Sequence, residues 1–351
     1  MVSGPRINLG ARAVGAGEPS YLIAEVGANH DRDLDVARRL IDEAADAGVD
    51  AVKFQTYTGR GLYSTRTPKF EYLGELADEP AHELLERISL PREWQPILSE
   101  HCAERGVAFI STPFDREAVD ELDALDVPAY KVASFEIVDL PFLEYIGSKR
   151  RPVIVSTGMA DLEEIGEALG ALRKGGATEA ALLQCASLYP APPSVMNLRS
   201  IETMREEFGV PVGLSDHTLG IHISVAAVAR GASIIEKHFT LDRGRPGPDH
   251  PFAIEPPELR ELVRQVRDVE AALGDGQKVG PSTEEASEMY AKARRSLVAA
   301  VAIPAGTTIT DAMLTAKRPG FGIKPKHLPE VIGRVARVDI PEDEVVTWDM
   351  V

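Results

Sequence analysis

The sequence is poor in cysteine and in long apolar stretches. Its two cysteines, Cys102 and Cys185, are too few for a disulfide framework or a cysteine-rich zinc site. Cys185 lies within the apolar run ALLQCAS, which favours a buried free thiol. No apolar run approaches the ~20 residues that cross a bilayer, and the opening MVSGPRINLGARAV lacks a signal-peptide core. We therefore expect a soluble, cytoplasmic protein with no membrane partner.

Positive charge is also scarce. The chain has 38 lysines and arginines against 55 aspartates and glutamates, which gives a formal net charge of −17. A field of that sign repels nucleic acid and anionic membranes, so we expect no nucleic-acid partner. An anionic small molecule would need a local cluster of donors that works against the field of the whole protein.

Apolar runs alternate with amphipathic segments up to about residue 275 of the 351-residue chain. Near-continuous hydrophobic runs are typical of parallel strands covered on both faces. Eight strand–helix units within roughly 250 residues predict a (β/α)₈ TIM barrel. The alternative, an open doubly wound sheet, usually carries G-x-G-x-x-G after its first strand, where this chain has EVGANH. The predicted strands span residues 21–27, 50–56, 107–113, 129–134, 152–158, 180–187, 210–216 and 232–239.

Two segments interrupt this alternation. Residues 57–91 form a long insertion after the second strand, and loops beyond ~15 residues are usually functional or disordered. A lid over the barrel mouth and a tolerated surface insertion both fit. From residue 274 the chain turns polar and glycine-containing. We predict a barrel domain over 1–276, a linker over 277–292 and a small short-stranded module over 293–351.

Polar residues end nearly every predicted strand, which is where a barrel places its chemistry. The lysines Lys53 and Lys131, surrounded by hydroxyls, indicate an anion site for a phosphate or a carboxylate. Core ion pairs between these lysines and Glu25 or Glu136 are the alternative. The strand ends also supply Gln55, Thr112, Ser134, Ser156, Ser187, Tyr189, Ser215 and Glu236, with Asp249 in the loop after the last strand.

Histidines end the last two predicted strands, His217 in GLSDHTLG and His238 in SIIEKHFT. Consecutive barrel strands are neighbours, so the two imidazoles could share one metal ion. Two nitrogens do not complete a structural zinc site, but with waters they make an open site that can polarise a substrate carbonyl. A hydrogen-bonded core role is the alternative for either histidine alone. Asp216 could orient an imidazole or cap the following helix.

Taken together and in order, these strand ends resemble the sialic acid synthase family. The motifs are IAEVGANH, VKFQTY, ISTPF, YKVASFE, VSTGMA, GLSDHTLG, EKHFTLD and GPDH. That family condenses phosphoenolpyruvate with an amino sugar to make nonulosonic acids. The tail KRPGFGI resembles the family's C-terminal antifreeze-like (SAF) domain. The resemblance therefore implies a TIM barrel followed by a small SAF domain.

The resemblance also assigns roles to individual positions. His217 and His238 match metal ligands, with Mn²⁺ the usual ion and Mg²⁺ or Co²⁺ as alternatives. Glu25 or Glu136 is expected to handle the proton of the attacking water. Arg318 matches an arginine that reaches the partner's barrel, which implies a domain-swapped homodimer. The phosphoenolpyruvate positions are Lys53, Thr112, Lys131, Ser134, Ser156, Ser187 and Ser215; the sugar positions are Gln55, Tyr189, Asp249 and Arg318.

The acceptor sugar is not settled by these motifs. Ser187 stands where the N-acetylneuraminate branch commonly has asparagine, and SFE stands where that branch often has SGE. Either N-acetylmannosamine or a diacetamido-trideoxyhexose fits the expectation. A synthase of 3-deoxy sugar acids acting on another aldose is one alternative. A non-catalytic carbohydrate-binding homologue is the other.

Overall fold

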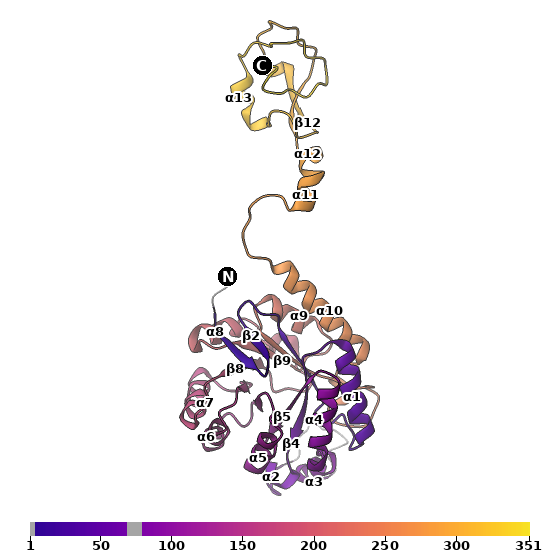
Figure 1. Cartoon of the computed structure of the whole chain (residues 1–351), viewed down its shortest axis with the longest axis vertical. Coiled ribbons are helices and arrows are strands. Elements are labelled where there is room, and N and C mark those ends of the chain that lie inside the picture. Colours follow the sequence, from indigo (N-terminus) through magenta and orange to yellow (C-terminus); the bar gives the residue numbers. More distant parts are fainter. Residues whose placement is uncertain (1–3, 69–78) are drawn as a thin grey trace. The chain divides into compact units, whose positions relative to one another are not determined.

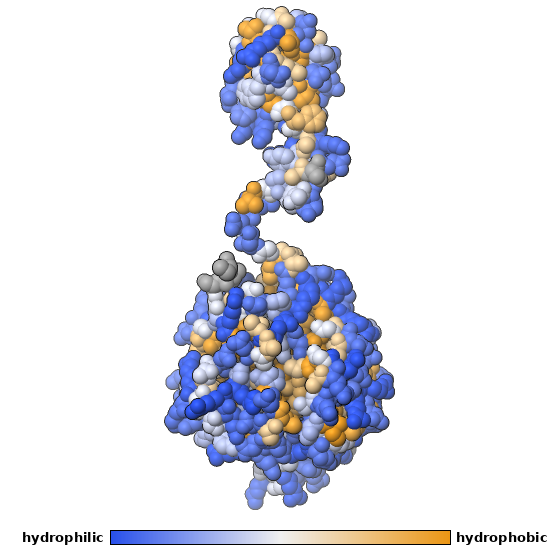
Figure 2. Space-filling view, in the orientation of Figure 1, coloured by the Kyte–Doolittle hydropathy of each residue, from blue (hydrophilic) through white to orange (hydrophobic). Residues whose placement is uncertain are grey.

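The computed structural model describes residues 4–68 and 79–351. The chain divides into two compact units, Met1–Gly274 and Asp275–Val351. In Figure 2, hydrophilic residues cover most of the face of the first unit that is drawn, with apolar residues in small patches between them. No helix among the described residues is long and apolar enough to span a membrane.

The first unit is a parallel barrel, as the sequence predicted. Its eight-stranded sheet has the order β5-β4-β3-β10-β9-β8-β7-β6, and the two outermost strands, β5 and β6, contact each other. Every pairing within the sheet is parallel. The strands are β3 (Tyr21–Glu25), β4 (Ala51–Thr56), β5 (Ala108–Pro113), β6 (Tyr130–Val132), β7 (Val153–Ser156), β8 (Ala180–Cys185), β9 (Val212–Asp216) and β10 (Ile234–His238).

Helices surround the barrel (Figure 1). Local signals set their ends: Asp33 caps the first helix with its side chain and Gly48 ends it in the left-handed conformation, while Asp161 and Glu164 form a capping box. The outer helices are α1 (Leu34–Ala47), α4 (Gln95–Glu104), α5 (Arg116–Ala124), α6 (Leu140–Ser148), α7 (Leu162–Gly175), α8 (Ser200–Phe208), α9 (His222–Ala229) and α10 (Pro256–Leu273).

A hairpin that the sequence did not reveal closes the end of the barrel at which the strands begin. It consists of β1 (Arg6–Leu9) and β2 (Arg12–Gly15), paired antiparallel. Its Ile7, Leu9 and Val14 pack in one buried cluster with the first inward-facing residues of the strands, such as Tyr21 and Ile23. In Figure 1, β2 lies at the opposite end of the barrel from α2 and α3. The apolar floor therefore leaves only the other end open for chemistry.

The long insertion after β4 contributes the two short helices α2 (Gly59–Leu62) and α3 (Ala81–Ile88). Glu86 accepts a hydrogen bond from the backbone amide of Gly59, which ties α3 to α2. The predicted insertion covers 57–91, and its part from 69 to 78 lies outside the described residues. The described parts stand at the open end of the barrel.

The second unit has its own small core, built from residues such as Leu297, Ile303 and Val346. Its strands are β11 (Ser296–Ala299) and β12 (Leu314–Lys317), paired antiparallel, and short helical turns that include α13 (Leu328–Val331) follow β12. The predicted linker 277–292 contains α11 (Thr283–Ser287) and most of α12 (Met289–Ala293). The predicted boundaries after residues 276 and 292 stay predictions.

Candidate active site

The inward-facing side chains of each strand change from apolar to polar along the barrel axis. In β3, Tyr21 and Ile23 belong to the buried floor, and Glu25, two residues on, lines a cavity at the carboxyl end. The period of two in a strand produces this stacking. The same strand-end layer holds Lys53, Thr112, Lys131, Ser156, Ser215, Glu236 and His238, with Gln55, Ser134, Tyr189 and His217 beside it.

A cluster of four buried charges lies at the centre of this layer. Lys53 Nζ is 2.9 Å from Glu25 Oε2 and 3.5 Å from Glu236 Oε2, and Lys131 Nζ is 4.0 Å from the same Glu236 oxygen. All four side chains are at most 5% exposed. The core ion-pair alternative is therefore confirmed for Lys53 with Glu25, whereas the carboxylate near Lys131 is Glu236 and not Glu136; both lysines also line the cavity.

The pKa values within this cluster diverge. Burial raises the pKa of Glu25 to about 7, even though Lys53 opposes the shift. Glu236 behaves differently: Lys131 and Lys53 outweigh its burial and hold its pKa below the ordinary value. Burial lowers the pKa of Lys131, whereas Glu236 and Glu25 together outweigh burial at Lys53 and raise its pKa. Protonating Glu25 would leave two lysines against one carboxylate, a net positive site for an anion.

Hydroxyl groups surround the lysines. Lys53 donates to Thr112 at 3.2 Å and Lys131 donates to Ser156 at 2.6 Å, while Ser215 donates to Glu236 at 2.8 Å. Ser134 and Ser187 hydrogen-bond to each other at 3.0 Å. Gly158 packs directly against both serines, since a Cβ there would lie 2.5–2.6 Å from their side chains. Ser187 lines a neighbouring pocket rather than the central cavity.

The two strand-end histidines face each other, with ring centroids 5.5 Å apart. Burial lowers the pKa of both imidazoles, so both are neutral at pH 7. His217 Nδ1 donates to the carbonyl of Ala186 at 2.8 Å, so Nε2 carries the lone pair, and it lies 3.5 Å from the Ser215 hydroxyl oxygen. His238 Nδ1 is buried, has no hydrogen-bond partner and lies 3.9 Å from Asp249 Oδ2. Two neutral imidazoles, one of them with an unpartnered nitrogen, fit a divalent ion such as Mn²⁺.

The described residues contain no group of three or more histidine, cysteine or carboxylate side chains placed to hold a metal. An ion on His217 and His238 would thus keep positions open for water or a substrate oxygen. Asp216, an expected partner for an imidazole, does not contact His217 through its side chain. It instead accepts from Thr218 and from Ser224 in α9.

A second cavity adjoins the first and shares Gln55, Phe114, Phe135, Tyr189 and His238 with it. Its remaining walls are mostly apolar and come largely from the insertion. They comprise Tyr57, Leu62, Tyr63, Leu84, Leu85 and Ile88, with Asp249 as the carboxylate of the set. Asp249 accepts from the amide of Ala28 at 3.1 Å, and a Cβ at Gly27 would lie 2.4 Å from its carboxylate oxygen. The described insertion therefore forms part of a binding wall.

Of the predicted site residues, Ser187 and Glu136 line neither cavity, and Arg318 belongs to the second unit. Glu136 follows β6, is half-buried, and has an Oε2 atom that is buried without a hydrogen-bond partner; burial raises its pKa to about 7. Arg318 lies directly after β12 in the second unit and is exposed.

The sequence placed Glu236 at a strand end but indicated no role for it, and it did not indicate Phe135 as a site residue. Glu236 precedes His238 by two residues on β10, so strand alternation places both on the inner face, and that spacing could have identified it. Phe135 is 50% exposed at the junction of the two cavities. No local sequence pattern marks such a position.

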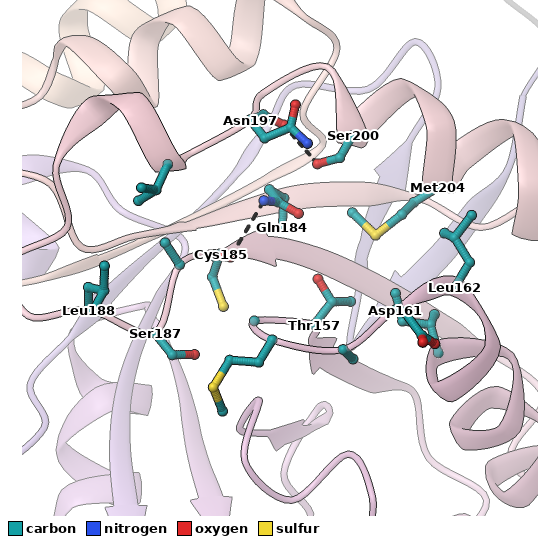
Figure 3. Close-up of a pocket in the computed structure, with 16 residues that line it drawn as sticks. Thr157, Asp161, Leu162, Gln184, Cys185, Ser187, Leu188, Asn197, Ser200 and Met204 are labelled. Atoms are coloured by element: carbon teal, nitrogen blue, oxygen red, sulfur yellow. Dashed lines mark hydrogen bonds between the residues drawn. The ribbon is translucent and has the colours of Figure 1, made fainter.

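A separate pocket lies between the strand ends and the outer helices (Figure 3). Thr157, Leu162 and Met204 line it, and Cys185 and Ser187 separate it from the central cavity. Its one charged lining residue, Asp161, caps α7. Because the lining has no cation, this pocket does not match the predicted anion site.

The fold and the cavity define a TIM-barrel protein with an anion site and a two-histidine site at its carboxyl end. The chain belongs to the NeuB family, whose model matches residues 40–278, and an SAF domain matches residues 294–351. It is 42% identical over 331 residues to the N,N'-diacetyllegionaminic acid synthase of Campylobacter jejuni, covering 93% of this chain and 98% of that one. Identity to the pseudaminic acid synthase of the same species is 37% over 323 residues, covering 91% and 93%.

A solved structure confirms the fold. The N-acetylneuraminic acid synthetase of Leptospira borgpetersenii, crystallised with citrate, superposes with a TM-score of 0.72 at 35% identity. The match covers 82% of this chain and 95% of that one. The relatives are thus named synthases of sialic-type acids, in agreement with the family resemblance of the motifs.

Proposed function

We propose that this protein condenses phosphoenolpyruvate with an unphosphorylated amino sugar to give a nonulosonic acid and phosphate. The observation that carries the proposal is the pairing, in one cavity, of two buried lysines ringed by hydroxyls with two neutral, facing histidines. An anion and an electrophilic carbonyl would then bind side by side. The relatives named as synthases support the same reaction class.

Phosphoenolpyruvate is the anion proposed for the lysine cluster. Lys53 and Lys131 supply charge, and Thr112, Ser156 and Ser134 supply hydroxyl donors within hydrogen-bonding reach of the same space. Ser215 and Ser187 complete the proposed set, Ser187 through its hydrogen bond to Ser134. Charge-assisted hydrogen bonds in a water-poor cavity are stronger than they are in bulk water.

His217 and His238 would hold a divalent cation, Mn²⁺ by family resemblance with Mg²⁺ or Co²⁺ as alternatives. When bound, the ion supplies Lewis-acid polarisation of the aldehyde oxygen of the open-chain sugar. The C2=C3 π pair of phosphoenolpyruvate forms the bond from C3 to that aldehyde carbon, which leaves C2 electron-deficient, and the aldehyde oxygen takes up a proton. Water then bonds to C2 and gives up its two protons, one to balance that uptake and one to the departing phosphate. The C2–O bond to phosphate breaks with its electron pair leaving on the phosphate, and C2 becomes a ketone.

Glu25 is the carboxyl that the geometry favours for the proton of the attacking water. Its Oε2 atom contacts Lys53, which places it beside the proposed anion, and its pKa of about 7 suits proton transfer near neutral pH. Gln55 donates to Glu25 Oε1 at 2.7 Å and fixes its orientation. Glu136 lines neither cavity, so a direct role would require that it move.

The second cavity is the proposed acceptor site. Its leucines, Ile88 and Phe135 favour a sugar that carries methyl and acetamido groups over one rich in hydroxyls. Gln55, Tyr189 and Asp249 remain as polar contacts for the few hydroxyls that must be oriented. A diacetamido-trideoxyhexose therefore fits this cavity better than N-acetylmannosamine. Identity to the legionaminic acid synthase of Campylobacter jejuni, 42%, is higher than identity to the N-acetylneuraminate-9-phosphate synthase of Mus musculus, 37%, which supports this choice.

We also propose a domain-swapped homodimer in which Arg318 reaches the acceptor site of the partner's barrel. Arg318 is exposed and, within the described residues, forms no ion pair, so its guanidinium is available to a sugar or a sugar-contacting carboxylate. A cytoplasmic location agrees with the supply of both substrates.

The decisive experiment measures phosphate release from phosphoenolpyruvate with Mn²⁺ across a panel of aldoses. The panel holds N-acetylmannosamine, two diacetamido-trideoxyhexoses and a phosphorylated pentose. We expect release with a diacetamido-trideoxyhexose, lost on chelation and lost in His217→Ala. Release with the phosphopentose alone would reassign the protein to the 3-deoxy sugar-acid synthases. No release with any aldose, together with sugar binding, would indicate the non-catalytic homologue.

A further inference from the structure

Behind the two histidines, on the outer side of the barrel wall, lies a buried ion pair. β9 and β10 run parallel, with Asp216 and Lys237 directly opposite each other in the register. Their sequence neighbours Ser215, Glu236 and His238 line the central cavity, so strand alternation turns Asp216 and Lys237 toward the helices. Lys237 Nζ is 3.0 Å from Asp216 Oδ2, and the two side chains are 1% and 0% exposed.

The contacts of this pair extend into the turn that carries His217. Asp216 Oδ1 accepts from the backbone amide of Thr218 at 2.9 Å and from its hydroxyl at 2.8 Å. Asp216 Oδ2 accepts from Ser224 in α9 at 2.6 Å, and Lys237 donates to the carbonyl of Thr218. The strand ends, the turn and the helix are therefore joined through one carboxylate and one ammonium group.

Stability alone is a weak reason for burying these charges. A buried ion pair is often no more stabilising than apolar side chains of the same volume. Apolar side chains cannot fix the orientation of the turn that carries His217, because dispersion contacts favour close packing but have no preferred direction. The pair precedes both histidines by one residue, and metal–ligand distances tolerate errors of only about 0.2 Å.

We infer that the Asp216–Lys237 pair is a positioning device for the two-histidine site. It fixes the ends of β9 and β10 so that His217 and His238 keep the separation and ring orientation at which one divalent ion can bind both. Neither side chain lines either cavity, so both act only through the histidines that follow them. This inference rests on the metal site of the proposed function.

The test measures binding of Mn²⁺ alone to the full chain by calorimetry, without substrates or turnover. The variant Asp216→Leu/Lys237→Met removes both charges together and so leaves no unpaired buried ion. We expect it to fold and to bind Mn²⁺ about 10- to 100-fold more weakly, the range typical for groups that orient metal ligands. Leu169→Ala is the control: it removes a buried side chain from α7, which follows β7, two strands from β9 in the sheet, and it should bind Mn²⁺ normally.

A second variant keeps the inference testable if the double variant does not fold. Ser224→Ala deletes one hydrogen bond to Asp216 and leaves the ion pair in place, and we expect a loss of Mn²⁺ affinity of at least about threefold, roughly 0.65 kcal/mol. If the Mn²⁺ affinity of Ser224→Ala, and of the double variant when it folds, stays within about twofold of wild type, the positioning inference is wrong and the proposed metal site stands. A wild-type chain that binds no Mn²⁺ instead overturns the proposed metal site and the inference with it.

Discussion

Replacing Glu136 by glutamine should change how the stability of the barrel depends on pH. Burial raises the pKa of Glu136 from 4.5 to about 7, so the folded chain holds this proton more tightly than the unfolded chain does. The stabilisation that the proton brings is present below pH 4.5 and is lost as the pH rises through 7. Glutamine keeps the shape and cannot ionise.

The size of the effect follows from the two pKa values. Ionising the folded carboxyl costs about 3 kcal/mol relative to the unfolded chain, and most of this cost, about 2 kcal/mol, appears between pH 5 and pH 8. The free energy of unfolding of Glu136→Gln relative to wild type should therefore be about 2 kcal/mol greater at pH 8 than at pH 5. Contributions from groups that do not interact with Glu136 cancel in that difference.

Urea unfolding followed by the fluorescence of Trp94 provides the assay. Trp94 packs against the barrel core, and a Trp348→Phe background removes the signal of the second unit. Glu167→Gln on the exposed face of α7 is the matched control, with an expected difference below about 0.5 kcal/mol at either pH. If the pH dependence of Glu136→Gln runs parallel to that of wild type, Glu136 is not a destabilised buried carboxyl.

Two further predictions concern the substrates. Lys131→Met should raise the KM for phosphoenolpyruvate roughly 10- to 100-fold, because it removes a charge-assisted contact, and should change the KM for the amino sugar little. Steady-state kinetics that show the opposite pattern would remove Lys131 from the proposed anion site. Arg318→Ala should lower kcat/KM for the amino sugar and leave the KM for phosphoenolpyruvate unchanged. Mixing these two variants should restore activity if the site is shared between subunits, because a mixed dimer then contains one intact site; no recovery after subunit exchange would refute the domain swap.

The barrel itself could be predicted from the sequence, because its signals are local. Buried parallel strands are continuous apolar runs, and helix ends carry their own caps, as at Asp33 and Asp161. The hairpin β1–β2 escaped prediction, since four-residue strands leave too short a pattern and their burial depends on the barrel above them.

The site was predictable in its composition but not in its arrangement. The strand ends carry the lysines, hydroxyls and histidines in the sequence itself, and strand alternation places Glu25, Lys53 and His238 on the inner face. The partner of each group is decided by contacts between strands far apart in the chain. Only the fold shows that Lys53 meets both Glu25 and Glu236, or that His217 is oriented by the carbonyl of Ala186 rather than by its neighbour Asp216.

The sequence by itself thus determined the barrel, its reactive end and the family, since periodicity and strand-end residues are properties of short segments. The tertiary structure decided which charges are buried together, which face of β9 Asp216 occupies, and that the insertion supplies an apolar wall beside Tyr189. Those outcomes depend on burial and on through-space distance. Neither quantity exists until residues far apart in the chain have packed together.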